Sequence, residues 1–217
     1  MKLMTYNIRL GMQRGLDRIA DIIGAQDPDV VALQEVGRHW TSGPDADATE
    51  LLADRTGLRH TSFLTTIEEQ RDDDRIAEYG HSVLSRWPLG RVDSFEFDQY
   101  LDEPRRAMLL RIDAPDVPFF VLAVHLSHIE GERQTHGKQL LDILDGIEGL
   151  DGPLFMVGDL NETPDGEPWM QELLERFVDA CPGGLPTYPA EEPERRIDYI
   201  LSSGGRWLNC EVLDELS

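Results

Sequence analysis

The chain alternates short apolar runs with stretches in which apolar residues recur every three or four positions. Residues 30–33 (VVAL) and 117–125 (VPFFVLAVH) are continuous apolar runs, which are typical of buried strands. Residues 16–23 carry apolar residues at helical spacing, and we expect Gly24 to end that helix. The pattern predicts helices at 16–23, 49–56, 129–148 and 165–177, and strands at 2–9, 30–33, 58–67, 79–85, 90–97, 106–112, 117–125, 154–157, 197–202 and 206–213.

These elements predict a single domain over residues 1–217. Some strands follow one another as hairpin-like pairs, whereas others are separated by helices. A four-layered α/β sandwich, in which two packed β-sheets are flanked by helices, accommodates both arrangements. Residues 68–78 are densely charged, and we expect them to form an exposed loop. Gly57 is the expected C-cap of the second helix, and Asp165 the expected N-cap of the fourth.

The charge of the chain is strongly negative. Lys and Arg number 20 against 42 Asp and Glu, which gives a formal net charge of −22. Such a field repels polyanions and disfavours long nucleic acids as substrates, although a few arginines and a divalent metal can reverse its sign locally. For most of these acids a solvated surface is a sufficient explanation.

The sequence gives several cues to compartment. The N-terminus begins in strand-like sequence without the apolar segment of a signal peptide, and no apolar stretch approaches the roughly 20 residues that span a bilayer. Cys181 and Cys210 have no metal-type spacing and cannot form a disulfide framework. We therefore expect inert cysteines and a monomeric, cytoplasmic protein.

Polar side chains stand where the apolar runs end. In residues 157–165 (VGDLNETPD), Asp159 and Asn161 follow a buried strand and share one face of an extended backbone. A turn is the alternative reading, because Asp, Asn, Pro and Gly all favour turns. Four further residues end or begin apolar runs in the same way: Asn7, Glu35, His125 and Asp198. Each of them alone also fits a structural role, but packed strands bring their ends to one rim.

The donor types limit the chemistry of such a rim. Carboxylates and carboxamides without clustered cysteines or histidines are hard oxygen donors, which suit Mg²⁺ or Mn²⁺ better than zinc. A Mg²⁺ ion held by few protein ligands usually binds substrate phosphate. The residues thus predict metal-assisted hydrolysis of a phosphoester by an activated water.

Six ordered motifs resemble the endonuclease/exonuclease/phosphatase superfamily, and most closely its short bacterial metal-dependent hydrolases. They span nearly the whole chain: 5–9 (TYNIR), 33–36 (LQEV), 79–89 (YGHSVLSRWPL), 123–128 (AVHLSH), 158–164 (GDLNETP) and 195–201 (RRIDYIL). The resemblance implies a DNase I-like four-layered sandwich and a Mg²⁺- or Mn²⁺-dependent phosphohydrolase.

The resemblance also implies roles for individual residues. Asn7 and Glu35 match the metal-site asparagine and glutamate. Asp159 matches the aspartate that activates water, and Asn161 the neighbouring phosphate-site asparagine. His125 matches a histidine that donates to the phosphate. Asp198 matches a carboxylate that orients a second histidine near the C-terminus.

The sequence departs from the family pattern at two places. Many relatives read Gly-Asn where this chain has Gly80-His81, so His81 is either a phosphate donor or a core residue. Relatives close with Ser-Asp-His, whereas this sequence stops at Leu216-Ser217. We expect the last C-terminal strand of the domain to be missing, either because the chain was trimmed or because Asp198 has lost its partner.

Two arginines are further candidates for substrate contacts. Arg106, next to Arg105 at the start of a strand, is selected as a phosphate contact, with a surface ion pair as the alternative. Arg133 stands at the start of the long helix, where backbone N–H groups also attract anions.

The leading hypothesis is hydrolysis of a small or lipid-derived phosphate. A DNA or RNA nuclease of the same fold and a non-catalytic phosphate-binding protein are the alternatives.

Overall fold

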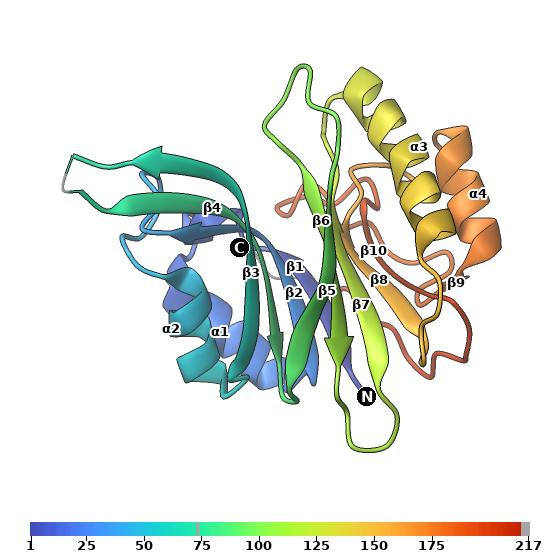
Figure 1. The fold of residues 1–217 in the computed structure, drawn as a ribbon, viewed down its shortest axis with the longest axis horizontal. Helices are drawn as coiled ribbons and strands as arrows, with labels where there is room; N and C mark the ends of the chain where they lie inside the picture. The colour runs from blue at the N-terminus through green and yellow to red at the C-terminus, as the bar shows by residue number, and fades with distance from the viewer. Residues whose placement is uncertain (73, 214–217) are drawn as a thin grey trace.

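Two β-sheets pack face to face in the computed structural model, which describes residues 1–72 and 74–213 (Figure 1). Helices cover the outer face of each sheet, so the molecule has the four layers that the sequence predicts. The ten described strands divide four and six between the sheets, in the orders β1-β2-β4-β3 and β5-β6-β7-β8-β10-β9. Among the helices of the described residues, none is long and apolar enough to cross a membrane.

The four-stranded sheet holds the N-terminal part of the chain. Its strands are β1 (Leu3–Asn7), β2 (Val30–Arg38), β3 (His60–Gln70) and β4 (Ile76–Ser85). β1 runs parallel to β2, and the other pairs are antiparallel. Helices α1 (Gly15–Gln26) and α2 (Ala48–Thr56) pack on its outer face through residues such as Ile19 and Leu52. A short 3₁₀ turn, η1 (Arg9–Gly11), follows β1.

The six-stranded sheet holds the rest of the chain. Its strands are β5 (Leu89–Glu96), β6 (Arg106–Ile112), β7 (Phe119–His125), β8 (Leu154–Asp159), β9 (Val178–Asp179) and β10 (Asp198–Ser202). β7 and β8 are parallel because α3 (Glu130–Gly146) crosses between them. α3 and α4 (Pro168–Arg176) cover the outer face of this sheet.

The layer between the sheets explains the continuous apolar runs of the central strands. Met108, Val121 and Val157 face the other sheet, while their strand neighbours face α3 and α4. All seven residues of β7 are buried, because both faces of this strand are covered. Burial of side chains on both faces holds these strand ends in fixed positions.

Four local predictions are wrong, each for a physical reason. Residues 68–70 and 76–78 form the protruding end of the β3–β4 hairpin, where most side chains are exposed to water and charge is tolerated (Figure 1). Helix α1 continues through Gly24 and ends at Asp27, which adopts the left-handed conformation. Helix α4 begins at Pro168 with Glu167 as N-cap, because proline suits the first helical turn better than its interior. Residues 206–213 form no strand. The C-cap predicted at Gly57 is confirmed.

Gly158 allows β7 and β8 to approach each other just before Asp159. Its φ is 144°, and a Cβ atom built there would lie 1.8 Å from the Val124 carbonyl oxygen. Only glycine fits at this point without moving the backbone. The strand end that carries Asp159 therefore depends on this residue.

We predict that Gly158→Ala lowers the free energy of unfolding by at least about 3 kcal/mol, because the new methyl group overlaps backbone. Gly24→Ala is the matched control. Gly24 lies in α1 with open space around its Cα, so this change is expected to stabilise the protein by about 0.5–1 kcal/mol. Chemical denaturation of both variants measures the difference, and equal stabilities would contradict the close approach.

Candidate active site

Strand register brings three polar residues together at one end of the six-stranded sheet. Asp159, the last residue of β8, pairs with His125 on the parallel strand β7. On its other side it pairs with Asp198, the first residue of the antiparallel strand β10. The sequence predicts the strand ends, and the register places their side chains in one row.

The four-stranded sheet supplies two more residues. Asn7 ends β1. Glu35 lies at a bulge in β2, where the pairing with β4 shifts between Leu33 and Val36, and its φ is 53°. A left-handed φ is rare for glutamate, and it occurs here at the position that turns this side chain towards Asn7.

The Asn7 amide joins the two sheets. Its Nδ2 donates to Glu35 Oε1 at 2.8 Å and to Asp159 Oδ2 at 3.2 Å. The second of these hydrogen bonds crosses from one sheet to the other. Glu35 and Asp159, which follow Asn7 by 28 and 152 positions in the sequence, thus meet at one amide group.

Asn161 is fixed by the turn that leaves β8. Its φ is 53°, its backbone N–H donates to Asp159 Oδ1 at 2.9 Å, and its Nδ2 donates to the Leu126 carbonyl at 2.9 Å. The turn interpretation of this segment is therefore correct for the backbone. It also orients both Asp159 and Asn161, so the turn and the candidate site are the same feature.

Carboxylates crowd the site. Burial and then the neighbouring Asp198 raise the pKa of Asp159 well above its usual value, and Glu35 adds to this effect. Burial raises the pKa of Asp198 to about 6. Burial therefore disfavours the ionised forms of both aspartates, and a positive charge beside them would favour those forms.

Arg105 supplies a cation on the other side of His125. Its side chain is only 5% exposed, and Nη1 lies 2.8 Å from His125 Nδ1 and 3.0 Å from Nε2. His125 Nε2 is in turn 3.8 Å from Asp159 Oδ2. Burial, and then Arg105, lowers the pKa of His125 well below its usual value, so its imidazole is neutral at pH 7.

Two acids hold the Arg105 guanidinium in place. Asp102 Oδ2 accepts from Arg105 Nη2 at 3.1 Å, and Glu103 Oε1 lies 3.0 Å from Nη1. The Tyr79 hydroxyl donates to Glu103 Oε1 at 2.8 Å. Arg105 is therefore a preorganised charge that a phosphate oxygen can approach without reordering the side chain.

A cavity of about 1160 Å³ lies against these groups. Seven of the nine site residues selected from the sequence line it: Asn7, Glu35, His125, Arg133, Asp159, Asn161 and Asp198. Arg133 is held there by Glu162, whose Oε2 lies 3.1 Å from Nε, and by the His128 carbonyl at 2.7 Å from Nη1. Arg133 thus forms an ion pair with Glu162 and also lies beside the cavity.

Arg106 and His81 do not line the cavity. Arg106 donates to the Thr65 carbonyl at 2.9 Å and forms an ion pair with Glu96, because successive side chains point to opposite faces and Arg105 takes the inner one. His81 is buried behind His125, with ring centroids 5.7 Å apart. Burial, and then Arg105, lowers its pKa to about 3. We therefore move the expected phosphate contact from Arg106 to Arg105 and leave His81 in the core.

Nearly the whole sequence matches a known family. The profile of the Endonuclease/Exonuclease/phosphatase family matches residues 4–215. The chain belongs to that family.

Solved structures of this family share the fold. An endonuclease/exonuclease/phosphatase from Beutenbergia cavernae superposes with a TM-score of 0.71 at 24% identity, covering 94% of this chain and 64% of that chain. The mannosyl-6-phosphatase Bt3783 of Bacteroides thetaiotaomicron gives 0.66 at 15% identity, covering 94% and 85%. Sphingomyelinase C from Streptomyces griseocarneus gives 0.64 at 19%, covering 95% and 85%. No curated protein sequence matches the chain.

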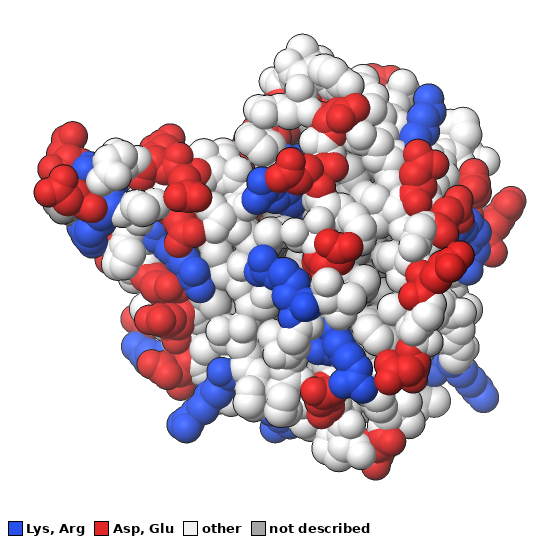
Figure 2. Space-filling view, in the orientation of Figure 1, with Lys and Arg blue, Asp and Glu red and all other residues white. Residues whose placement is uncertain are grey.

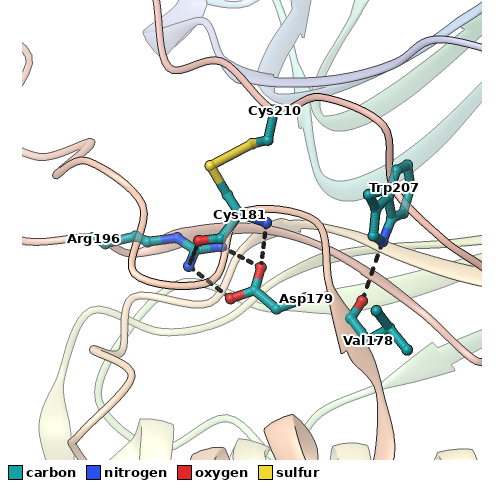
Figure 3. The surroundings of a disulfide bond; sticks show 6 residues. All are labelled: Val178, Asp179, Cys181, Arg196, Trp207 and Cys210. Carbon is teal, nitrogen blue, oxygen red and sulfur yellow. Dashed lines mark hydrogen bonds and ion pairs between the residues drawn. A yellow bond between two sulfur atoms is a disulfide. The ribbon is translucent and has the colours of Figure 1, made fainter.

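In this family member a disulfide closes one wall of the cavity. Cys181 and Cys210, which both line it, are bonded, so the prediction of two inert thiols is wrong (Figure 3). Fold contacts bring them together across 29 residues of sequence, a separation that carries no signal by itself. Arg196 forms a bidentate ion pair with Asp179 beside the bond, and the Trp207 indole donates to the Val178 carbonyl (Figure 3).

The donor set fits a hard divalent cation. Glu35, Asp159 and Asn7 line one cavity and carry oxygen donors, and burial and then the neighbouring Asp198 raise the pKa of Asp159. Within residues 1–72 and 74–213, no three His, Cys, Asp or Glu side chains form a ready-made metal cluster. Mg²⁺ commonly takes only one or two protein carboxylates, with water and phosphate as its other ligands.

The raised pKa of Asp198 has a consequence for stability. An acid whose pKa is higher in the folded state binds more protons there than in the unfolded state, so stability falls as pH rises from about 4 to about 6. We predict that Asp198→Asn raises the melting temperature in EDTA by about 3 °C at pH 7.5 and changes it little at pH 4. Thermal melts at the two pH values measure this, and an equal shift at both would contradict it.

The disulfide closes a loop of about thirty residues, which in the chain-entropy account stabilises by roughly 3–4 kcal/mol. We predict that Cys210→Ser lowers the melting temperature by about 5 °C or more. Reductant should then have no further effect on the melting temperature of the variant. Wild type treated with reductant should behave like the variant. A melting temperature unchanged in both cases would show that the bond does not form in solution.

Proposed function

We propose that this family member is a Mg²⁺- or Mn²⁺-dependent phosphoester hydrolase that uses an activated water. The observation that carries the proposal is the Asn7 bridge, because it gathers Glu35 and Asp159 from two sheets at one cavity. That arrangement unites hard oxygen donors with a buried guanidinium. It suits a phosphate that must meet a divalent cation and fixed hydrogen-bond donors together.

Each residue has a distinct role in the proposal. Glu35 and Asn7 hold the cation, which when bound supplies positive charge to the phosphate. Asp159 accepts a proton from the attacking water, and its raised pKa makes it a stronger base than a surface aspartate. Asn161 and His125 donate hydrogen bonds to phosphate oxygens, while Arg105 and Arg133 offset their charge.

The charge around the cavity favours an anionic substrate. Among the described residues only four acids line it, Glu35, Asp159, Asp198 and Glu211, although the chain has 42. Seven of the chain's 20 basic residues line it: Lys2, Arg9, Arg105, Arg133, Arg195, Arg196 and Arg206. Elsewhere acids are widespread, as Figure 2 shows for one face of the molecule. The field thus attracts a phosphate locally while the surface around it repels long polyanions.

We therefore favour a small or lipid-derived phosphate as substrate. The printed names of two structural neighbours, a mannosyl-6-phosphatase and a sphingomyelinase, agree in kind with such a substrate. A monomeric state stays a prediction. The cytoplasmic location also stays a prediction, and the disulfide weighs against it because such bonds persist mainly in oxidising compartments.

We predict that the wild type hydrolyses an aryl phosphoester only when Mg²⁺ or Mn²⁺ is present and loses this activity in EDTA. Asp159→Asn and Glu35→Gln should each reduce the rate by at least about 100-fold, because one removes the base and the other a cation ligand. Asp116→Asn changes an exposed acid outside the cavity and is the matched control, with unchanged activity.

Thermal-shift measurements distinguish the loss of a cation ligand in Glu35→Gln from the loss of the base in Asp159→Asn. Mg²⁺ should raise the melting temperature of wild type and of Asp116→Asn, and this shift should disappear in Glu35→Gln. A panel of sugar phosphates, lipid phosphates and supercoiled plasmid then identifies the substrate class. Efficient plasmid nicking that Asp159→Asn abolishes would favour a nuclease instead. Metal binding without turnover of any phosphoester would favour the non-catalytic phosphate-binding protein.

A further inference from the structure

A second histidine stands at the rim of the cavity. His128 lies three residues after His125, in the connection between β7 and α3, and its side chain is 66% exposed. It lines the same cavity as Asp159 and Asn161. Among the described residues, His125 and His128 are the histidines that line this cavity.

A carboxylate orients the His128 ring. Nδ1 of His128 lies 3.1 Å from Asp102 Oδ2, and the Asp102 side chain is 12% exposed. Since the two ring nitrogens point in different directions, an Nδ1–H bonded to Asp102 leaves Nε2 directed away from this carboxylate. An acid that fixes the tautomer and orientation of an imidazole is the usual support for a histidine that transfers protons.

Asp102 does not need His128 for its own hydrogen bonding. The same Oδ2 atom accepts from Arg105 Nη2 at 3.1 Å and from the Ser127 hydroxyl at 2.9 Å. Ser127 Oγ also lies 3.1 Å from Oε2 of the buried Glu132, whose Oε1 accepts from the backbone N–H groups of Tyr100 and Leu101. The loop that carries Asp102 is therefore anchored without the imidazole, and a purely structural role leaves the exposed ring unexplained.

A chain of contacts connects His128 to the reacting groups. Asp102 joins His128 to Arg105, Arg105 lies against His125, and His125 Nε2 is 3.8 Å from Asp159 Oδ2. His125 is a poor proton donor, because it is buried against a permanent cation that disfavours its protonated form. His128, by contrast, is exposed to solvent at the rim of the cavity and lies beside the Asp102 carboxylate.

We propose that His128 is the general acid that protonates the leaving group, with Asp102 as its positioning residue. The inference rests on the proposed phosphoester hydrolysis and adds a residue to it. The water oxygen forms a bond to phosphorus and gives a proton to Asp159. The bond between phosphorus and the leaving oxygen breaks, and the proton on His128 Nε2 passes to that oxygen. His128 is left as a neutral imidazole that keeps its Nδ1–H, hydrogen-bonded to Asp102 Oδ2, and solvent restores the Nε2 proton.

The test compares leaving groups. Wild type and His128→Gln are assayed with a series of aryl phosphoesters that runs from 4-nitrophenyl, which leaves readily as an anion, to phenyl, which needs a proton. We expect His128→Gln to lose about 100-fold or more on the phenyl ester and less than about 10-fold on the 4-nitrophenyl ester. His60→Gln, at an exposed histidine outside the cavity, is the matched control and should match wild type on both.

Chemical rescue provides a second readout. Free imidazole should restore part of the activity of His128→Ala towards the phenyl ester and have little effect on its activity towards the 4-nitrophenyl ester. Melting temperatures of both variants should equal that of wild type, since the ring is mostly exposed.

The outcomes separate this inference from the proposed function. Equal losses on all esters, or no loss on any, with wild-type turnover intact, would overturn the role of His128 alone. Failure of the wild type to turn over every ester with metal would overturn the phosphoester hydrolase proposal and the role of His128 with it.

Discussion

The structure depends on the enforced proximity of Glu35, Asp159 and Asp198. Separated in water these carboxylates would each be ionised and well hydrated, but the packed sheets bring them to one partly closed place. Burial raises the pKa values of both aspartates, and the neighbouring Asp198 and Glu35 raise that of Asp159 further. The fold thus holds buried acids at its strand ends, and in the proposed function a bound cation would stabilise their ionised forms.

The scaffold can hold these buried acids in place because the surrounding strands are rigid. β7 and β8 are buried on both faces, and Gly158 lets them approach closely just before Asp159. The bulge in β2 holds Glu35 in a left-handed conformation that the sheet on either side imposes. Stability is therefore concentrated in the layers between the sheets and beneath α3 and α4, and the destabilising groups are confined to one rim.

Much of this arrangement is readable in the sequence. Continuous apolar runs such as 117–125 identify the doubly covered strands, and the polar residues that follow them identify the rim. Side-chain direction is less accessible: Arg105 and Arg106 are equivalent as sequence, and only the strand geometry decides that Arg105 faces His125. His128, Asp102 and the Cys181–Cys210 bond depend on contacts between loops, for which hydrophobic periodicity carries no signal. The outer end of the β3–β4 hairpin, residues 68–70 and 76–78, was predicted as a loop because its charged side chains lie at the surface, which a loop also allows.

The most direct test of the account is to locate the cation. Crystals grown or soaked with Mn²⁺ allow the ion to be identified by its anomalous scattering. The account predicts an anomalous peak at the cavity beside Glu35 and Asn7, on the side that faces Asp159, and no such peak there in crystals of Glu35→Gln. A well-occupied Mn²⁺ ion at another place, with this cavity empty in the wild type, would contradict the claim that the two sheets meet to hold a cation.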